Sequence, residues 1–160
     1  MKPWADTPER VKEIQHAAAK WVGTPWVPNS AALGAGVSCH NLPRAILIEA
    51  GCLPVEFPEV VGDPAQMRWG KEDTIKDWLD GRPEFEAFAV DEWEPDPFMV
   101  GDVIGFSIGP KIQHLALYVG RGWVIHVLKH QKTACDSISD PTWRGRIVRA
   151  WRPVIYGQES

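Results

Sequence analysis

The spacing of apolar residues changes along this chain, from a helical period near the N-terminus to an alternating period in the C-terminal part. From "VGDVIGFSIG" onward, β-branched and aromatic residues predict strands over residues 102–108, 114–119, 123–128 and 147–155. Helices that come first and strands that come after favour an α+β fold with an antiparallel sheet, because a parallel sheet requires the two to alternate.

Two helices are expected before the strands. Thr7 is a suitable N-cap and Pro8 suits the first helical position, where its missing N–H costs nothing, while Gly23 ends the first helix. A second helix is predicted from about Cys39 to Glu49. Pro43 fits only the first turn of that helix, so regular hydrogen bonding should begin beyond Cys39.

The segment 54–98 is interrupted by prolines and contains one candidate helix, "KEDTIKDWLDG". We expect an irregular connector that covers one side of the functional site.

Length and charge limit the kind of protein this can be. The chain has 160 residues, 44% of them hydrophobic, which suffices for a single domain over residues 1–160. A net charge of −4 without a long basic block favours neither nucleic acid nor an anionic membrane as a partner. No apolar run approaches the ~18 residues of a membrane helix, and the N-terminus carries charges where a signal peptide would be apolar.

Three cysteines, Cys39, Cys52 and Cys135, give an odd count without metal-ligand spacing between them. A disulfide framework is therefore not expected, and at least one thiol should be free. We expect synthesis in the cytoplasm, without a signal peptide.

The segment "QHLALYVGRGWVIHVLK" predicts a β-hairpin closed by the loop 120–122. A three-residue loop pairs Val119 with Trp123. That register places His114 diagonal to His126 on the same face, about 7–8 Å apart at Cα. The hairpin therefore allows His114 to stand between a nucleophile and His126.

Cys39 has three possible roles: a core residue, a nucleophile or a metal ligand. A helix start and a nearby imidazolium lower a thiol pKa, which favours a thiolate nucleophile with His114 as base and His126 as its orienting partner. A zinc site with Cys39, His114 and His126 as ligands and an open fourth position is the metal alternative. Taken alone, a cysteine at a helix start is most often a packing residue.

The same residues resemble those of the NlpC/P60 family of papain-like cysteine peptidases. "WVGTPW" is similar to the family's W-x-G-T-P-Y motif, "GVSCHNLPRAILIEAG" to its G-x-D-C-S-G-L-V segment, "GDVIGF" to its G-D-L-v-f-F strand and "HLALYVGRGWVIHV" to its hairpin. The resemblance implies N-terminal helices packed on a central antiparallel sheet, with Cys39 as nucleophile, His114 as base and His126 as third polar residue. It also implies hydrolysis of peptidoglycan stem-peptide amides through a thioester, without a cofactor.

The chain departs from the family pattern around Cys39, where Ser38, His40 and Asn41 replace Asp, Ser and Gly. Together with Trp26, which replaces a family tyrosine, these residues are the candidate substrate-binding set. Loss of the carboxylate removes a partner for a substrate ammonium. We therefore expect tolerance of stem peptides whose N-terminus is still joined to the glycan.

Two further hypotheses remain open. One is a catalytically degenerate domain used for binding or assembly, for example in a phage tail; the other, less favoured, is the zinc hydrolase. The expected partners are a stem peptide or related small peptide, with phage tail or other delivery proteins as possible carriers to the cell wall.

Overall fold

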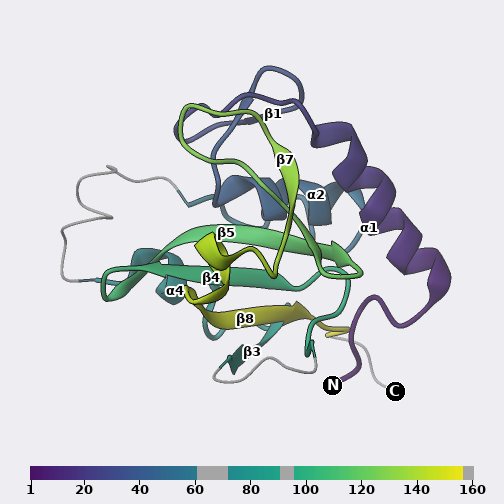
Figure 1. Ribbon diagram of the computed structural model, residues 1–160. Coiled ribbons are helices and arrows are strands. Elements are labelled where there is room, and N and C mark those ends of the chain that lie inside the picture. The colour runs from purple at the N-terminus through teal and green to yellow at the C-terminus, as the bar shows by residue number, and fades with distance from the viewer. Residues whose placement is uncertain (61–71, 91–95, 157–160) are drawn as a thin grey trace.

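The structure is a computed structural model and describes residues 1–60, 72–90 and 96–156 (Figure 1). A six-stranded antiparallel sheet forms its centre, in the order β3-β8-β4-β5-β6-β7. Its strands are β3 (Phe85–Ala89), β4 (Val103–Ile108), β5 (Lys111–Gly120), β6 (Trp123–His126), β7 (Ala134–Ser137) and β8 (Ile147–Pro153). The fold is therefore α+β, as the change of period predicts.

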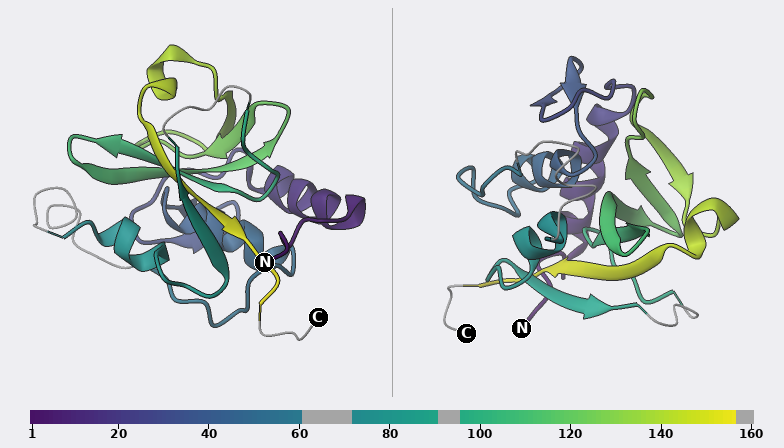
Figure 2. Two further views of the ribbon diagram at one scale, coloured as in Figure 1. Left: turned by 90° about the horizontal axis from the view of Figure 1, so that it is seen from below. Right: turned by 90° about the vertical axis from the view of Figure 1, so that its left-hand side faces the viewer.

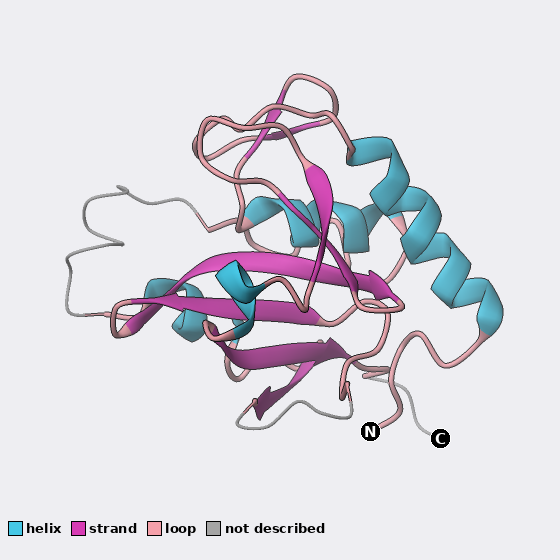
Figure 3. Cartoon of the chain, viewed as in Figure 1, coloured by secondary structure: helices cyan, strands magenta, loops and turns pink. Residues whose placement is uncertain are grey.

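Four helices and one small ribbon complete the described part of the chain (Figure 3). The helices are α1 (Pro8–Trp21), α2 (Asn41–Glu49), α4 (Thr74–Leu79) and α5 (Pro141–Arg144). The ribbon pairs β1 (Ala31–Ala32) with β2 (Gly36–Val37). None of these helices is long and apolar enough to cross a membrane.

The first helix begins as predicted. Thr7 is the N-cap of α1 and its hydroxyl accepts from the Arg10 N–H at 3.2 Å, while Pro8 occupies the first turn. Ile14 and Trp21 lie on the buried face. α1 and α2 pack together on one side of the sheet (Figure 2).

Apolar side chains on the two faces of the sheet form two separate cores. On the helix side, Leu115 and Ile125 pack with Ile46 of α2. On the other side, Phe106 and Val124 belong to a second buried cluster. Full burial of one such side chain contributes about 1.5–3 kcal/mol, so both faces stabilise the sheet.

Three elements of the structure, β3, β7 and α5, were not predicted from the sequence. The connector predicted for 54–98 contains α4 but also β3, an edge strand that pairs with β8. Neither β7 nor the short helix α5 was predicted, because short exposed segments carry little periodic signal. Part of the connector, 61–71 and 91–95, lies outside the described residues.

The β5–β6 hairpin keeps the predicted register over most of its length. Tyr118 pairs with Val124 as predicted, but at the tip Gly120, not Val119, pairs with Trp123. The loop is therefore one residue shorter than predicted, and a register shift at Val119 compensates for it. The two candidate histidines consequently remain on one face.

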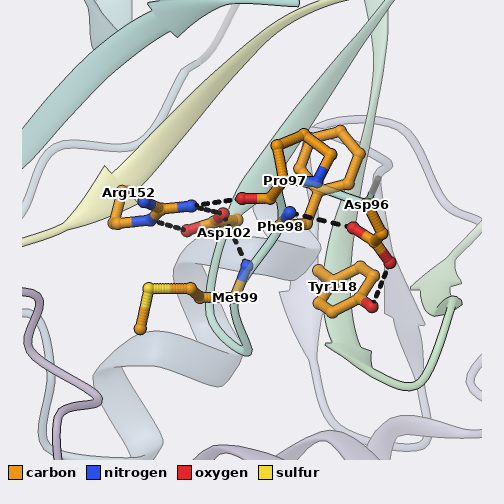
Figure 4. A network of polar contacts seen from close by, with 7 residues as sticks. All are labelled: Asp96, Pro97, Phe98, Met99, Asp102, Tyr118 and Arg152. Atoms are coloured by element: carbon orange, nitrogen blue, oxygen red, sulfur yellow. Dashed lines mark hydrogen bonds and ion pairs between the residues drawn. The ribbon is translucent and has the colours of Figure 1, made fainter. Parts of the chain in front are cut away.

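A polar network joins the turn before β4 to β5 and β8 (Figure 4). Fully buried Asp102 accepts two hydrogen bonds from Arg152, at 3.0 and 2.8 Å, and one from the Met99 N–H. Asp96 accepts from the Tyr118 hydroxyl at 2.6 Å. The paired charges offset the cost of burying the Asp102 carboxylate.

Candidate active site

A cleft of about 360 Å³ opens between the start of α2, the β5–β6 hairpin and α5. Its lining includes three of the candidate binding residues, two of the candidate catalytic residues and one aromatic side chain of α5: Trp26, Ser38, His40, Cys39, His114 and Trp143. Ile75 of α4 also lines the cleft, so the 54–98 segment covers one side of it, as expected.

Cys39 lies just before the first turn of α2. The helix begins at Asn41 with His40 as its N-cap residue, two residues later than the predicted start. The Cys39 Sγ lies 3.8 Å from His40 Nδ1 and 3.9 Å from the Gln113 carbonyl oxygen. The contact with Gln113 places the thiol against the β5 backbone, one residue along the strand from His114.

His114, His126 and Asp136 form a chain of hydrogen bonds that leads away from the cleft. His114 Nε2 lies 2.8 Å from His126 Nδ1, and His126 Nε2 lies 2.5 Å from Asp136 Oδ2. Asp136 belongs to β7, diagonal to His126 across the strand pair. The sequence analysis missed this residue because it missed the strand; the polar "CDS" alternation after the hairpin was the available signal.

The carboxylate fixes the tautomer of both imidazoles. An ionised carboxylate only accepts, so His126 donates from Nε2 to Asp136 and presents an unprotonated Nδ1. His114 must then donate from Nε2 to His126, which leaves the lone pair of His114 on Nδ1. This series of hydrogen bonds therefore leaves Nδ1 as the basic nitrogen of His114.

Aromatic rings enclose the histidine pair. Trp143 of α5 stacks on His114 with a centroid distance of 5.6 Å and an interplanar angle of 30°, and contacts His126 edge-on at 5.3 Å. Phe106 contacts His114 from β4 at 5.4 Å. These rings keep water away from both imidazoles.

Burial holds the thiol and the imidazole in their neutral forms. Burial raises the pKa of Cys39 to about 11 and lowers the pKa of His114 to about 3, with the neighbouring His126 and His40 lowering it further. The net shift of the Cys39 pKa is therefore opposite to the lowering expected from a helix terminus and an imidazolium. Desolvation outweighs the backbone hydrogen bonds, because it penalises a charge on either group.

Several side-chain polar atoms of the residues that flank Cys39 are buried without a hydrogen-bond partner in the described part of the chain. The polar atoms concerned are Ser38 Oγ, His40 Nε2 and both side-chain atoms of Asn41. Ser38 and His40 line the cleft, whereas Asn41 is fully buried and lies outside its lining. Burial lowers the pKa of His40 to about 4, so this ring is neutral near pH 7.

Trp26 forms an aromatic wall of the cleft, as expected from the sequence. Its ring meets His130 edge-on at a centroid distance of 5.2 Å. Its backbone N–H donates to the Gln131 carbonyl at 2.8 Å, which fixes this part of the chain against the segment after β6.

The zinc alternative receives no support from the described residues. They include no group of three His, Cys, Asp or Glu side chains arranged to hold a metal ion. His114 and His126 instead share a hydrogen bond, which occupies one nitrogen of each.

The NlpC/P60 family model matches residues 71–152, just over half of the chain. This chain belongs to the NlpC/P60 family. The matched region contains His114, His126 and Asp136, while the unusual Ser38–Asn41 segment lies outside it. A search of curated proteins gives no match.

Solved structures show the same fold at low sequence identity. A lipoprotein-like NLP/P60 protein from Staphylococcus aureus has a TM-score of 0.63 and 21% identity over 96% of this chain and 44% of its own. The NlpC/P60 domain of the peptidoglycan hydrolase SagA has a TM-score of 0.56 and 17% identity over 88% of this chain and 96% of its own. An NlpC/P60 family protein from Bacillus cereus has a TM-score of 0.59 and 18% identity over 91% of this chain and 40% of its own. This chain therefore spans less than half the length of the S. aureus protein.

Proposed function

We propose that this NlpC/P60 protein is a cysteine peptidase or amidase that hydrolyses an amide bond in peptidoglycan stem peptides. The observation that carries the proposal is the placement of Cys39 in a cleft with His114, whose basic nitrogen is set by His126 and Asp136. Membership of the family and the likeness to the SagA domain support the cell-wall substrate.

The reaction begins from a neutral pair. Cys39 Sγ attacks the amide carbonyl carbon while its proton passes to His114 Nδ1, and the resulting imidazolium is stabilised through His126 by the Asp136 carboxylate. The backbone N–H of Cys39 is the candidate donor to the oxyanion.

Collapse of the tetrahedral intermediate breaks the C–N bond. His114 gives its proton to the leaving amine, and a thioester on Cys39 remains. Water then attacks the thioester with His114 Nδ1 as base, which releases the acid and restores the thiol. No cofactor enters this sequence.

Three residues of the cleft are proposed to contact the substrate. Ser38 Oγ and His40 Nε2 are buried polar atoms without partners among the described residues, and a bound peptide would satisfy their hydrogen bonds. Trp26 supplies an apolar wall. Asn41 was included in this set from the sequence, but its burial favours an indirect role.

Digestion of purified stem-peptide fragments, followed by mass spectrometry, tests the proposal. We expect two products from cleavage at a single amide, whose summed mass exceeds that of the substrate by one water. Cys39→Ala and His114→Gln should abolish this cleavage, whereas the matched controls Cys52→Ala and Cys135→Ala should retain it. A chelator should have no effect. Hydrolysis that survives in Cys39→Ala would refute the mechanism.

A binding module is the second candidate. One observation favours it: burial raises the pKa of Cys39 to about 11, which leaves little thiolate at neutral pH. Wild-type protein that binds stem peptides and cleaves none would support this function.

Either function requires a route to the cell wall, for which we propose delivery with a phage tail or release on lysis.

A further inference from the structure

The charges that line the cleft are unevenly distributed. Among the lining residues that the structure describes, Lys129 is the only side chain that is charged near pH 7, because none is acidic and burial lowers the pKa values of His40 and His114 to about 4 and about 3. A cleft with one cation and no described anion favours substrates that carry a negative group.

Lys129 is held at the rim by a tight turn. The Gln131 N–H donates to the Leu128 carbonyl at 2.9 Å, and the Trp26 N–H donates to the Gln131 carbonyl at 2.8 Å. His130 within this turn has a φ of 65°, a left-handed conformation that is uncommon for a residue other than glycine. The backbone thus fixes Lys129 beside Trp26 despite a conformational cost.

The Lys129 ammonium has no competing partner in the described part of the chain. It forms no ion pair there, and its Nζ lies 6.0 Å from the centroid of the Trp26 ring. A cation over the indole face that forms no ion pair with the described residues is available to bind an anion that enters along the ring. The buried Ser38 hydroxyl, also without a partner, adds a donor to the same cleft.

We infer that this cleft binds its peptide substrate through a free carboxylate, and that Lys129 is the residue that determines this specificity. The inference rests on the proposed function for its substrate class. The carboxylate has two possible sources, the C-terminus of the peptide or an acidic side chain.

The test compares kcat/KM for a stem peptide that is hydrolysed with three derivatives: one amidated at the C-terminus, one with its acidic residue amidated, and one with both changes. We expect wild-type protein to prefer one carboxylate over its amide by about fivefold, since an ion pair at a partly exposed site is worth up to ~1 kcal/mol. The amidation that lowers kcat/KM shows whether the bound carboxylate is the C-terminus of the peptide or its acidic side chain.

Lys129→Ala should abolish the preference and Lys129→Arg should keep it. The matched control is Lys132→Ala, which removes the same charge from an exposed lysine of the same segment that lies outside the cleft lining. A preference that survives in Lys129→Ala, or equal rates on all four peptides in the wild type, would overturn the inference.

A second measurement separates this inference from the proposed function. Calorimetric binding of the same four peptides to Cys39→Ala requires no turnover. If the wild type hydrolyses none of them, the proposed function fails, while a Lys129-dependent binding preference still supports the carboxylate site. Binding in Cys39→Ala that is indifferent to amidation would overturn the site.

Discussion

The direction of the hydrogen bonds among His114, His126 and Asp136 determines which nitrogen of His114 can accept a proton. Because this series of hydrogen bonds ends on a carboxylate, each imidazole donates from Nε2. His126 accepts at Nδ1, and His114 keeps the lone pair of its own Nδ1. The Asp136 side chain is 44% exposed, so it acts from the surface on two buried rings. We expect it to orient His126 and, through it, His114.

Replacing Asp136 tests this directly. Asp136→Ala should lower kcat/KM about tenfold or more, because the tautomer is no longer fixed, while the free energy of unfolding changes by less than about 1 kcal/mol. Asp136→Asn keeps an acceptor but loses the charge, so it should retain more activity, with the acid limb of the pH–rate profile moved to lower pH. Wild-type kcat/KM in Asp136→Ala would contradict the role.

The buried histidines also predict how stability depends on pH. The folded-state pKa values of His40 and His114, about 4 and about 3, lie below the ordinary value of 6.5. The unfolded chain therefore binds more protons, and stability that is present above pH 6.5 is lost as pH falls toward 4. Each histidine adds about 1.4 kcal/mol per pH unit to this loss.

Urea unfolding at pH 7, 5.5 and 4.5 measures the effect. His40→Gln should lose stability less steeply with falling pH than the wild type, while His16→Gln, at an exposed histidine of α1, should not change the slope. Equal slopes in wild type and His40→Gln would show that His40 is not held neutral by burial.

At the scale of elements, two short segments, β7 and α5, contribute side chains to the candidate site beside those of α2 and the β5–β6 hairpin. The N-terminus of α2 presents Cys39 and the β5–β6 hairpin presents the two histidines, but β7 brings Asp136 and α5 brings Trp143. Asp140 caps α5 by accepting from the Thr142 N–H at 2.9 Å, which helps to fix a helix of one turn.

The Trp143 ring should matter more to activity than to stability. Trp143→Leu should lower kcat/KM about tenfold, because His114 loses the ring that orients it and excludes water, at a cost of about 1–2 kcal/mol in unfolding free energy. Trp123→Leu is the matched control, since that indole is half exposed on β6 and outside the cleft lining. Equal kcat/KM in the two variants would remove α5 from the site.

At the scale of the whole molecule, the last strand joins parts of the chain that are distant in sequence. β8 lies between β3 and β4, and its end pairs with the N-terminal residues, where the Trp4 N–H donates to the Pro153 carbonyl at 2.9 Å. The N-terminal residues therefore lie beside the end of β8 (Figure 1). Arg152 adds the ion pair with buried Asp102 that fixes the turn before β4.

Breaking this ion pair should destabilise the whole domain. Arg152→Met leaves the Asp102 carboxylate buried without its cation and should cost about 3 kcal/mol in free energy of unfolding, measured in urea. The double variant Asp102→Asn/Arg152→Met should recover part of the loss, because no unpaired charge remains. A double variant as unstable as the sum of the single changes would exclude a charge effect.

Features fixed by neighbouring residues could be predicted from the sequence. The N-cap and first turn of α1 depend on Thr7 and Pro8. The strand alternation of the hairpin predicted that His114 and His126 share a face, which the register shift at Val119 preserves despite the shorter loop. Cys39 became a candidate through its local position before a helix taken together with the two hairpin histidines and the family motif. These properties depend on a few consecutive residues, so they can be predicted without knowing the tertiary structure.

Contacts between distant segments could not be predicted. Asp136 and Trp143 reach the histidines only because β7 pairs with β6 and α5 folds back over the sheet, and neither segment has a periodic pattern of its own. The neutral states of Cys39 and His114 were likewise decided by burial, which depends on what packs against a residue. The sequence by itself determined the class of fold and the candidate residues Cys39, His114 and His126. The tertiary structure decided the pKa shifts of Cys39 and His114 and the direction of the hydrogen bonds that end on Asp136, because desolvation and hydrogen-bond polarity arise only where distant parts of the chain meet.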